Sequence, residues 1–71
     1  MPVEPAARVL LTAWRDGDPS RLAAALNLAE AACRNRAGDF ERCDLLDAIV
    51  GAIRGGNRHG VLGRLLAHLA A

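Results

Sequence analysis

Apolar residues on the two sides of Gly38 form a mirror image. Cys33 lies five residues before this glycine, and Cys43 lies five residues after it. Apolar residues three or four positions apart share one face of a helix. The pattern therefore predicts two helices folded back on each other about a short turn at Gly38. The further pairs across the mirror are Ala29 with Leu46, Leu26 with Val50, and Leu22 with Ile53.

Capping residues and apolar spacing together predict four helices, at residues 5–15, 19–37, 40–54 and 58–70. Pro5 suits the first position of a helix, where no amide hydrogen is needed. Asp18, Asp39 and Asn57 are residue types that cap the amide ends of the later helices. Gly17 suits the end of the first helix.

Each expected helix has one apolar stripe that can face a shared core. The third helix uses Cys43, Leu46, Ile49, Val50 and Ile53. The first uses Ala6, Val9, Leu10, Ala13 and Trp14, and the fourth uses Val61, Leu62, Leu65, Leu66 and Leu69. The expected fold is all-α, a single domain over residues 1–71. In it, a central antiparallel helical hairpin is flanked by two shorter helices in a small bundle.

Leu28 and Leu45 lie outside the stripes that close the hairpin. Leu45 points about 100° away from Leu46 around the helix axis, so it needs a second contact. The first and fourth helices could cover both leucines, and so could a second copy of the chain or another protein. Trp14 has two interpretations, a core anchor or an interface residue of the kind that dominates binding energy.

The two cysteines allow three interpretations. In the first they are buried thiols that pack as small apolar residues at the closed end of the hairpin. In the second they form a disulfide, which the hairpin geometry permits. In the third they bind zinc with His59 and His68, although this set lacks the close ligand pairs of zinc sites. We expect packing and no metal.

Charge is segregated along the chain although the formal net charge is only +1. Beyond residue 48 there is no acidic residue, and this part carries Arg54, Arg58 and Arg64. Exposed glycine amides beside arginines can hold a phosphate or an acidic partner, but such a stretch is more often a solvated loop between helices. The small number of basic residues and the shortage of aromatic residues argue against a dedicated nucleic-acid binder.

The sequence contains no motif that indicates an enzyme. It has no phosphate-binding loop, no metal-binding signature and no nucleophile motif, and Ser20 is its only serine. We therefore expect no catalysis, no cofactor and no small-molecule substrate. The sequence has no apolar run long enough to span a membrane and no signal peptide, so a cytoplasmic location is the default expectation.

These observations favour a small protein–protein interaction module, expected to be a homodimeric adaptor or inhibitor that occupies a partner protein's surface. Mobile elements often encode proteins of this kind. The expected partner is itself, another protein, or both. The expected binding residues are Leu28, Leu45, Trp14, Arg54, Arg58 and Arg64. The alternative is a small nucleic-acid-binding regulator that uses the basic patch Arg54–Arg64.

Overall fold

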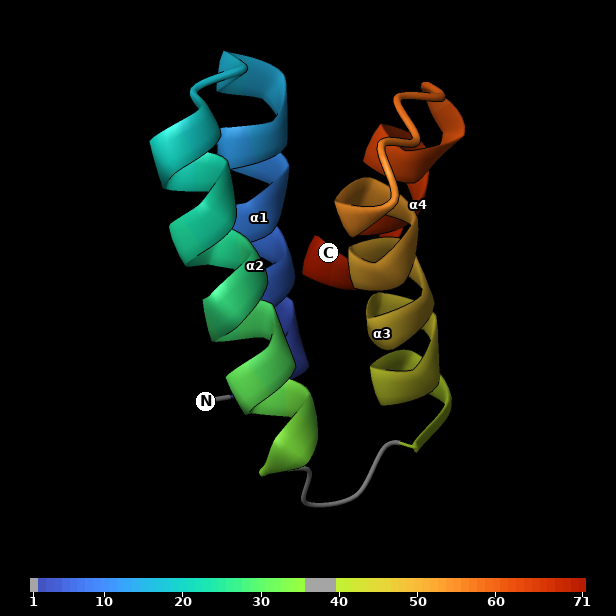
Figure 1. Cartoon of the computed structure of the whole chain (residues 1–71). Helices are drawn as coiled ribbons and strands as arrows, with labels where there is room; N and C mark the ends of the chain where they lie inside the picture. Colours follow the sequence, from blue (N-terminus) through green and yellow to red (C-terminus); the bar gives the residue numbers. More distant parts are fainter. Residues whose placement is uncertain (1, 36–39) are drawn as a thin grey trace.

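Four helices account for the regular structure of the part of the chain that the structure describes. The computed structural model describes residues 2–35 and 40–71. The helices are α1 (Val3–Asp16), α2 (Pro19–Arg34), α3 (Phe40–Arg54) and α4 (Val61–Ala70). Figure 1 shows α1 beside α2 and α3 beside α4, with α2 and α3 running in opposite directions. The structure confirms the all-α bundle and is consistent with the antiparallel hairpin of α2 and α3.

Although it comes first in the chain, α1 is the helix that joins the bundle together. It contacts α2, α3 and α4, and its most extensive contact is with α4. Helix α3 contacts both α2 and α4. The packed pair of α1 and α4 therefore covers one side of the α2–α3 hairpin.

The ends of α1 follow from local chemistry. The helix begins at Val3, two residues earlier than the sequence predicts. Pro5 still lies in the first turn, where backbone N–H groups have no acceptor within the helix. At the other end Gly17 has a φ of 72° and donates its N–H to the carbonyl of Ala13 at 3.2 Å. Glycine adopts this left-handed conformation without a steric penalty, so it ends the helix.

Asp18 caps α2 as predicted. Its Oδ1 accepts hydrogen bonds from the backbone N–H groups of Ser20 at 2.9 Å and Arg21 at 3.3 Å. The helix ends at Arg34, whereas the sequence predicted an end at residue 37. The predicted turn at Gly38 and the predicted cap of α3, Asp39, lie outside the described residues. Helix α3 has the predicted bounds.

Helix α4 begins at Val61, three residues later than predicted. The reason lies in the preceding loop. Asn57 accepts a hydrogen bond from the backbone N–H of His59 at 2.8 Å, so it orders the loop instead of capping the helix. Gly60 is the N-cap residue, and His59 Nδ1 accepts a hydrogen bond from the N–H of Val61, the first residue of the helix, at 3.1 Å.

The core confirms the predicted stripes of α2 and α3 and corrects the stripe of α1. Val9 was expected to face inward but is 44% exposed, whereas Leu11 is only 8% exposed. Val61, also expected in the core, is 37% exposed, and Phe40 is 61% exposed. The buried apolar residues of α2 and α3 are Leu22, Ala25, Leu26, Ala29, Ala32, Cys33, Cys43, Leu46, Ile49, Val50 and Ile53.

The contact between α1 and α4 depends on a close approach at Gly63. A Cβ atom built at this buried glycine would lie 2.8 Å from Cζ3 of Trp14. The indole ring therefore rests on the α4 backbone where only a glycine leaves room. Trp14 Nε1 is buried and has no hydrogen-bond partner among the described residues.

Two arginines bind the carboxyl end of α4. Arg8 Nη2 donates to the carbonyl of Ala70 at 3.0 Å, and Arg42 Nη2 donates to the carbonyl of Leu69. Arg42 Nη2 also lies 3.5 Å from Glu4 Oε1. Cations are favourable at this end of a helix because its last carbonyls lack partners within the helix. These contacts connect α4 to α1 and α3.

Candidate interaction groove

A largely apolar groove of about 660 Å³ runs between α1 and α2. Its lining includes the short side chains of the alanines at positions 13, 24 and 25, together with Val9 and Leu28. The complete lining is Arg8, Val9, Thr12, Ala13, Asp16, Arg21, Ala24, Ala25 and Leu28.

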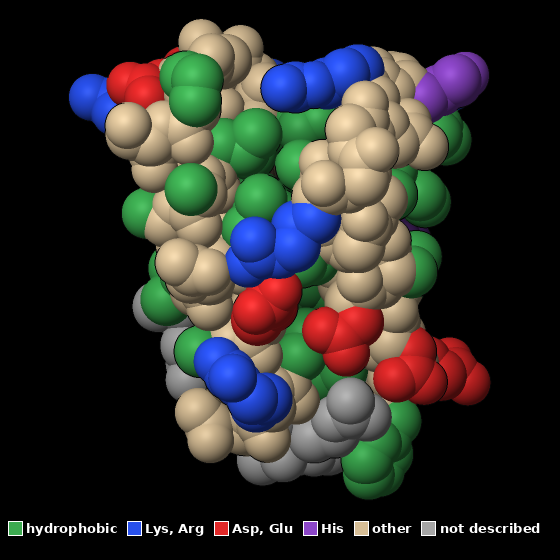
Figure 2. Space-filling view, viewed as in Figure 1, with side chains coloured by type: hydrophobic (Ala, Val, Ile, Leu, Met, Phe, Trp, Pro, Cys, Tyr) green, Lys and Arg blue, Asp and Glu red, His purple; other side chains and the backbone are tan. Residues whose placement is uncertain are grey.

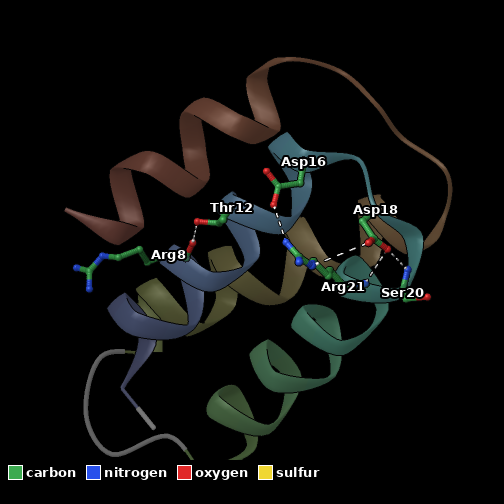
Figure 3. Close-up of polar contacts among 6 residues, drawn as sticks. All are labelled: Arg8, Thr12, Asp16, Asp18, Ser20 and Arg21. Atoms are coloured by element: carbon green, nitrogen blue, oxygen red, sulfur yellow. Dashed lines mark hydrogen bonds and ion pairs between the residues drawn. The ribbon is translucent and has the colours of Figure 1, made fainter.

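Opposite charges mark the two ends of this groove. Near the turn between α1 and α2, Arg21 lies 3.4 Å from Asp16 and 3.9 Å from Asp18, so these three side chains sum to one negative charge. Arg8 lines the other end, and its positively charged guanidinium donates to the Ala70 carbonyl at the end of α4. Figure 3 shows Arg8 toward one end of α1 and Asp16 near the other, with Thr12 between them.

A smaller cleft of about 340 Å³ lies between α2 and α3. Figure 2 shows hydrophobic side chains in the seam between these helices, with basic and acidic side chains beside it. Arg54 crosses the seam: its Nε donates to Glu30 Oε1 at 2.7 Å, and its Nη2 donates to Asn27 Oδ1 at 2.9 Å. These bonds link α3 to α2 and occupy much of the Arg54 guanidinium.

The cysteines are buried thiols that no disulfide joins. Cys33 Sγ donates to the carbonyl of Cys43 at 3.5 Å, as the predicted pairing at the closed end of the hairpin requires. Burial, and secondarily the nearby Asp47 carboxylate, raises the pKa of Cys33 from 9.0 to about 12. Nucleophilic cysteines need a lowered pKa, so Cys33 remains a protonated, packed side chain at neutral pH.

The described residues contain no group of three or more histidines, cysteines or acidic residues arranged to hold a metal ion. His59 accepts a hydrogen bond from the N–H of Val61, and Cys33 donates to the carbonyl of Cys43. The fourth candidate ligand, His68, is exposed on α4.

The residues predicted to bind a partner do not form one surface. Leu28 lines the α1–α2 groove, whereas Leu45 and Trp14 are half-buried against the core. Arg54 is bound to acceptors on α2. The two remaining arginines are exposed, Arg58 in the loop before α4 and Arg64 on α4 itself.

Sequence reasoning missed most of the groove. Arg8, Thr12 and Asp16 recur every four residues and so share one face of α1, a spacing that the sequence displays. Their position beside Ala24 depends on how α1 and α2 pack, which the spacing does not specify. Val9 was assigned to the core because it fits an apolar period that Leu11 fits equally well.

No protein-family model matches the chain, and no curated protein or solved structure is significantly similar to it. The part of the chain that the structure describes includes no helix with the length and apolar character needed to cross a bilayer. Functional inference therefore depends on the geometry above.

Proposed function

We propose that this protein is a non-enzymatic protein–protein interaction module and that the α1–α2 groove is its binding surface. The observation that carries the proposal is the combination of an alanine-rich lining with an exposed valine, Val9, in the same groove. A hollow apolar surface flanked by charged side chains is typical of sites that bind an amphipathic helix.

The dimensions of the groove suit a helical segment. Helix α1 has 14 residues and is therefore about 21 Å long, equal to about four turns of a bound helix. The alanines at positions 13, 24 and 25 allow close approach of a partner backbone, and Leu28 offers an apolar contact at one end. Binding of this kind would let the protein act as an adaptor or as an inhibitor, because either role requires occupation of a partner's surface.

Two exposed valines provide a matched test. Val9 lies in the groove, whereas Val61 lies on α4, outside it, with comparable exposure. We expect the Val9→Glu variant to lose a protein partner that the wild type and the Val61→Glu variant both retain. The measurement is affinity capture on the tagged chain with quantitative mass spectrometry, followed by titration with the purified partner.

The control is circular dichroism, which should show the same helix content for both variants. Equal retention of every stoichiometric partner by the Val9→Glu variant would contradict the proposal, and so would the absence of any partner. We do not extend the proposal to nucleic acid, because Arg54 in the candidate basic patch is already hydrogen-bonded to Glu30 and Asn27.

A further inference from the structure

We propose that the partner of the α1–α2 groove is a second copy of this chain, bound antiparallel about a two-fold axis that passes near Thr12. In this arrangement Arg8 of each copy meets the partner subunit's Asp16. The inference rests on the proposed function and specifies the partner, the orientation and the register of that same surface.

The charge pattern of α1 is self-complementary. Arg8, Thr12 and Asp16 follow one another along one face, with the Cα atoms of Arg8 and Asp16 about 12 Å apart along the helix axis and the small polar Thr12 midway between them. Rotation by 180° about an axis through the midpoint exchanges the two ends. Each positive end then lies against a negative end, and the symmetry forms the same contact twice.

The existing contacts of these groups leave room for the new ones. Arg8 uses one Nη2 donor on the carbonyl of Ala70, and a guanidinium has five N–H donors. Asp16 accepts from Arg21 through Oδ2 at 3.4 Å, and a carboxylate has about four acceptor positions. The partner subunit's Arg8 can therefore join the Asp16–Arg21 pair without displacing a bond of the fold.

Side-chain size also differs from one end of the groove to the other. Val9 and Leu28 lie at the Arg8 end, whereas the middle is lined by alanines and Thr12. The same rotation carries the larger apolar side chains of each copy toward the hollow half of the other. The exposed part of Val9 becomes covered, and the aliphatic stem of Arg21 faces an apolar surface.

The area available indicates a modest affinity. In each copy, α1 is about 21 Å long and α2 about 24 Å long, and at a width of about 10 Å the two helices together present a face of about 450 Å². The two copies together would bury on the order of 1,000 Å², near the lower bound for specific interfaces. We therefore expect a dimer that dissociates in the micromolar range.

Charge reversal with purified protein tests this arrangement. Sedimentation equilibrium between about 1 and about 500 µM should show a wild-type dimer. Arg8→Asp places two like-charged pairs at the interface, and so does Asp16→Arg, so each variant alone should dimerise about tenfold or more weakly. An equimolar mixture of the two variants restores both attractive pairs and should associate with nearly the wild-type affinity.

Arg64→Asp is the matched control, because Arg64 is an exposed arginine of α4, away from the α1 face and outside the groove lining. It should dimerise like the wild type. The mixture experiment also guards against misfolding, because an unfolded variant would not be rescued by its counterpart. A monomeric wild type at about 500 µM, or a mixture no tighter than its components, would overturn the inference.

These results separate the inference from the proposed function. A monomeric chain that captures a different protein through Val9 refutes the second copy as occupant and leaves the groove as a binding surface. A monomeric chain with no groove-dependent partner refutes both. A dimer that Val9→Glu and the charge variants leave intact also refutes the arrangement, because it would be built on another face.

Discussion

Replacing Gly63 with alanine tests the close packing of α1 on α4. The new Cβ would lie 2.8 Å from Cζ3 of Trp14, so the ring or the helix must move. Overpacking of this kind costs about 1–3 kcal/mol. Alanine in place of glycine within a helix gains about 1 kcal/mol. We therefore expect Gly63→Ala to lower the free energy of unfolding by about 1 kcal/mol.

Gly51→Ala provides the matched comparison, because Gly51 is also inside a helix and a Cβ there would meet nothing within 4 Å. It should gain about 1 kcal/mol from helix propensity alone. A chain of this size changes its melting temperature by about 4–8 °C per kcal/mol. Thermal and urea unfolding should thus move the two variants in opposite directions and separate their melting temperatures by at least about 4 °C.

A double variant identifies the contact responsible. In a Trp14→Leu background the clash is removed, so Gly63→Ala should become neutral or stabilising even though Trp14→Leu itself destabilises. The coupling between the two sites should be about 0.5–3 kcal/mol. If Gly63→Ala stabilised the wild type as much as Gly51→Ala does, the steric argument would be refuted.

Two further predictions concern local groups. Because the pKa of Cys33 is raised from 9.0 in an ordinary thiol to about 12 in the folded protein, the folded state holds this proton more tightly than the unfolded state. The stability that depends on the protonated thiol should therefore be fully present below pH 9 and fall as the pH rises toward 12. In a Cys43→Ala variant, Cys33 should react with a disulfide reagent at neutral pH only about as fast as the protein unfolds; reaction at the denatured rate would contradict its burial. Asp18→Ala removes the cap that accepts from Ser20 and Arg21. It should cost about 1 kcal/mol in urea unfolding, and Asp18→Asn should recover most of that loss.

The hairpin was predictable because its information is local. The stripes of α2 and α3 are bounded by turn and capping residues, and Cys33 and Cys43 meet as the mirror about Gly38 requires. Helix α1 was harder to orient because Leu10 and Leu11 are adjacent and both fit an apolar period. The structure buries both, so Val9 is turned outward. Its orientation is set by docking on α4, which a periodic pattern does not encode.

The candidate groove was harder to predict from the sequence than the fold. Leu28 was identified because no expected stripe used it, and it does line the groove. Leu45 met the same criterion but packs against the core, because residues from elsewhere in the chain cover it. The spacing of Arg8 and Asp16 is visible in the sequence. Its significance emerges only when α1 and α2 are placed side by side.

The extensive contact between α1 and α4 has a consequence for the order of folding. Pairs close in sequence, such as α1 with α2, require short loops, whereas α1 and α4 meet only after the whole chain has closed. During synthesis α1 would leave the ribosome before α4, whose Gly63 contacts Trp14 in the folded protein. We therefore expect slower folding than in helical bundles whose contacts are all between neighbours in sequence. Until α4 docks, the nascent chain would expose apolar surface that the finished protein buries.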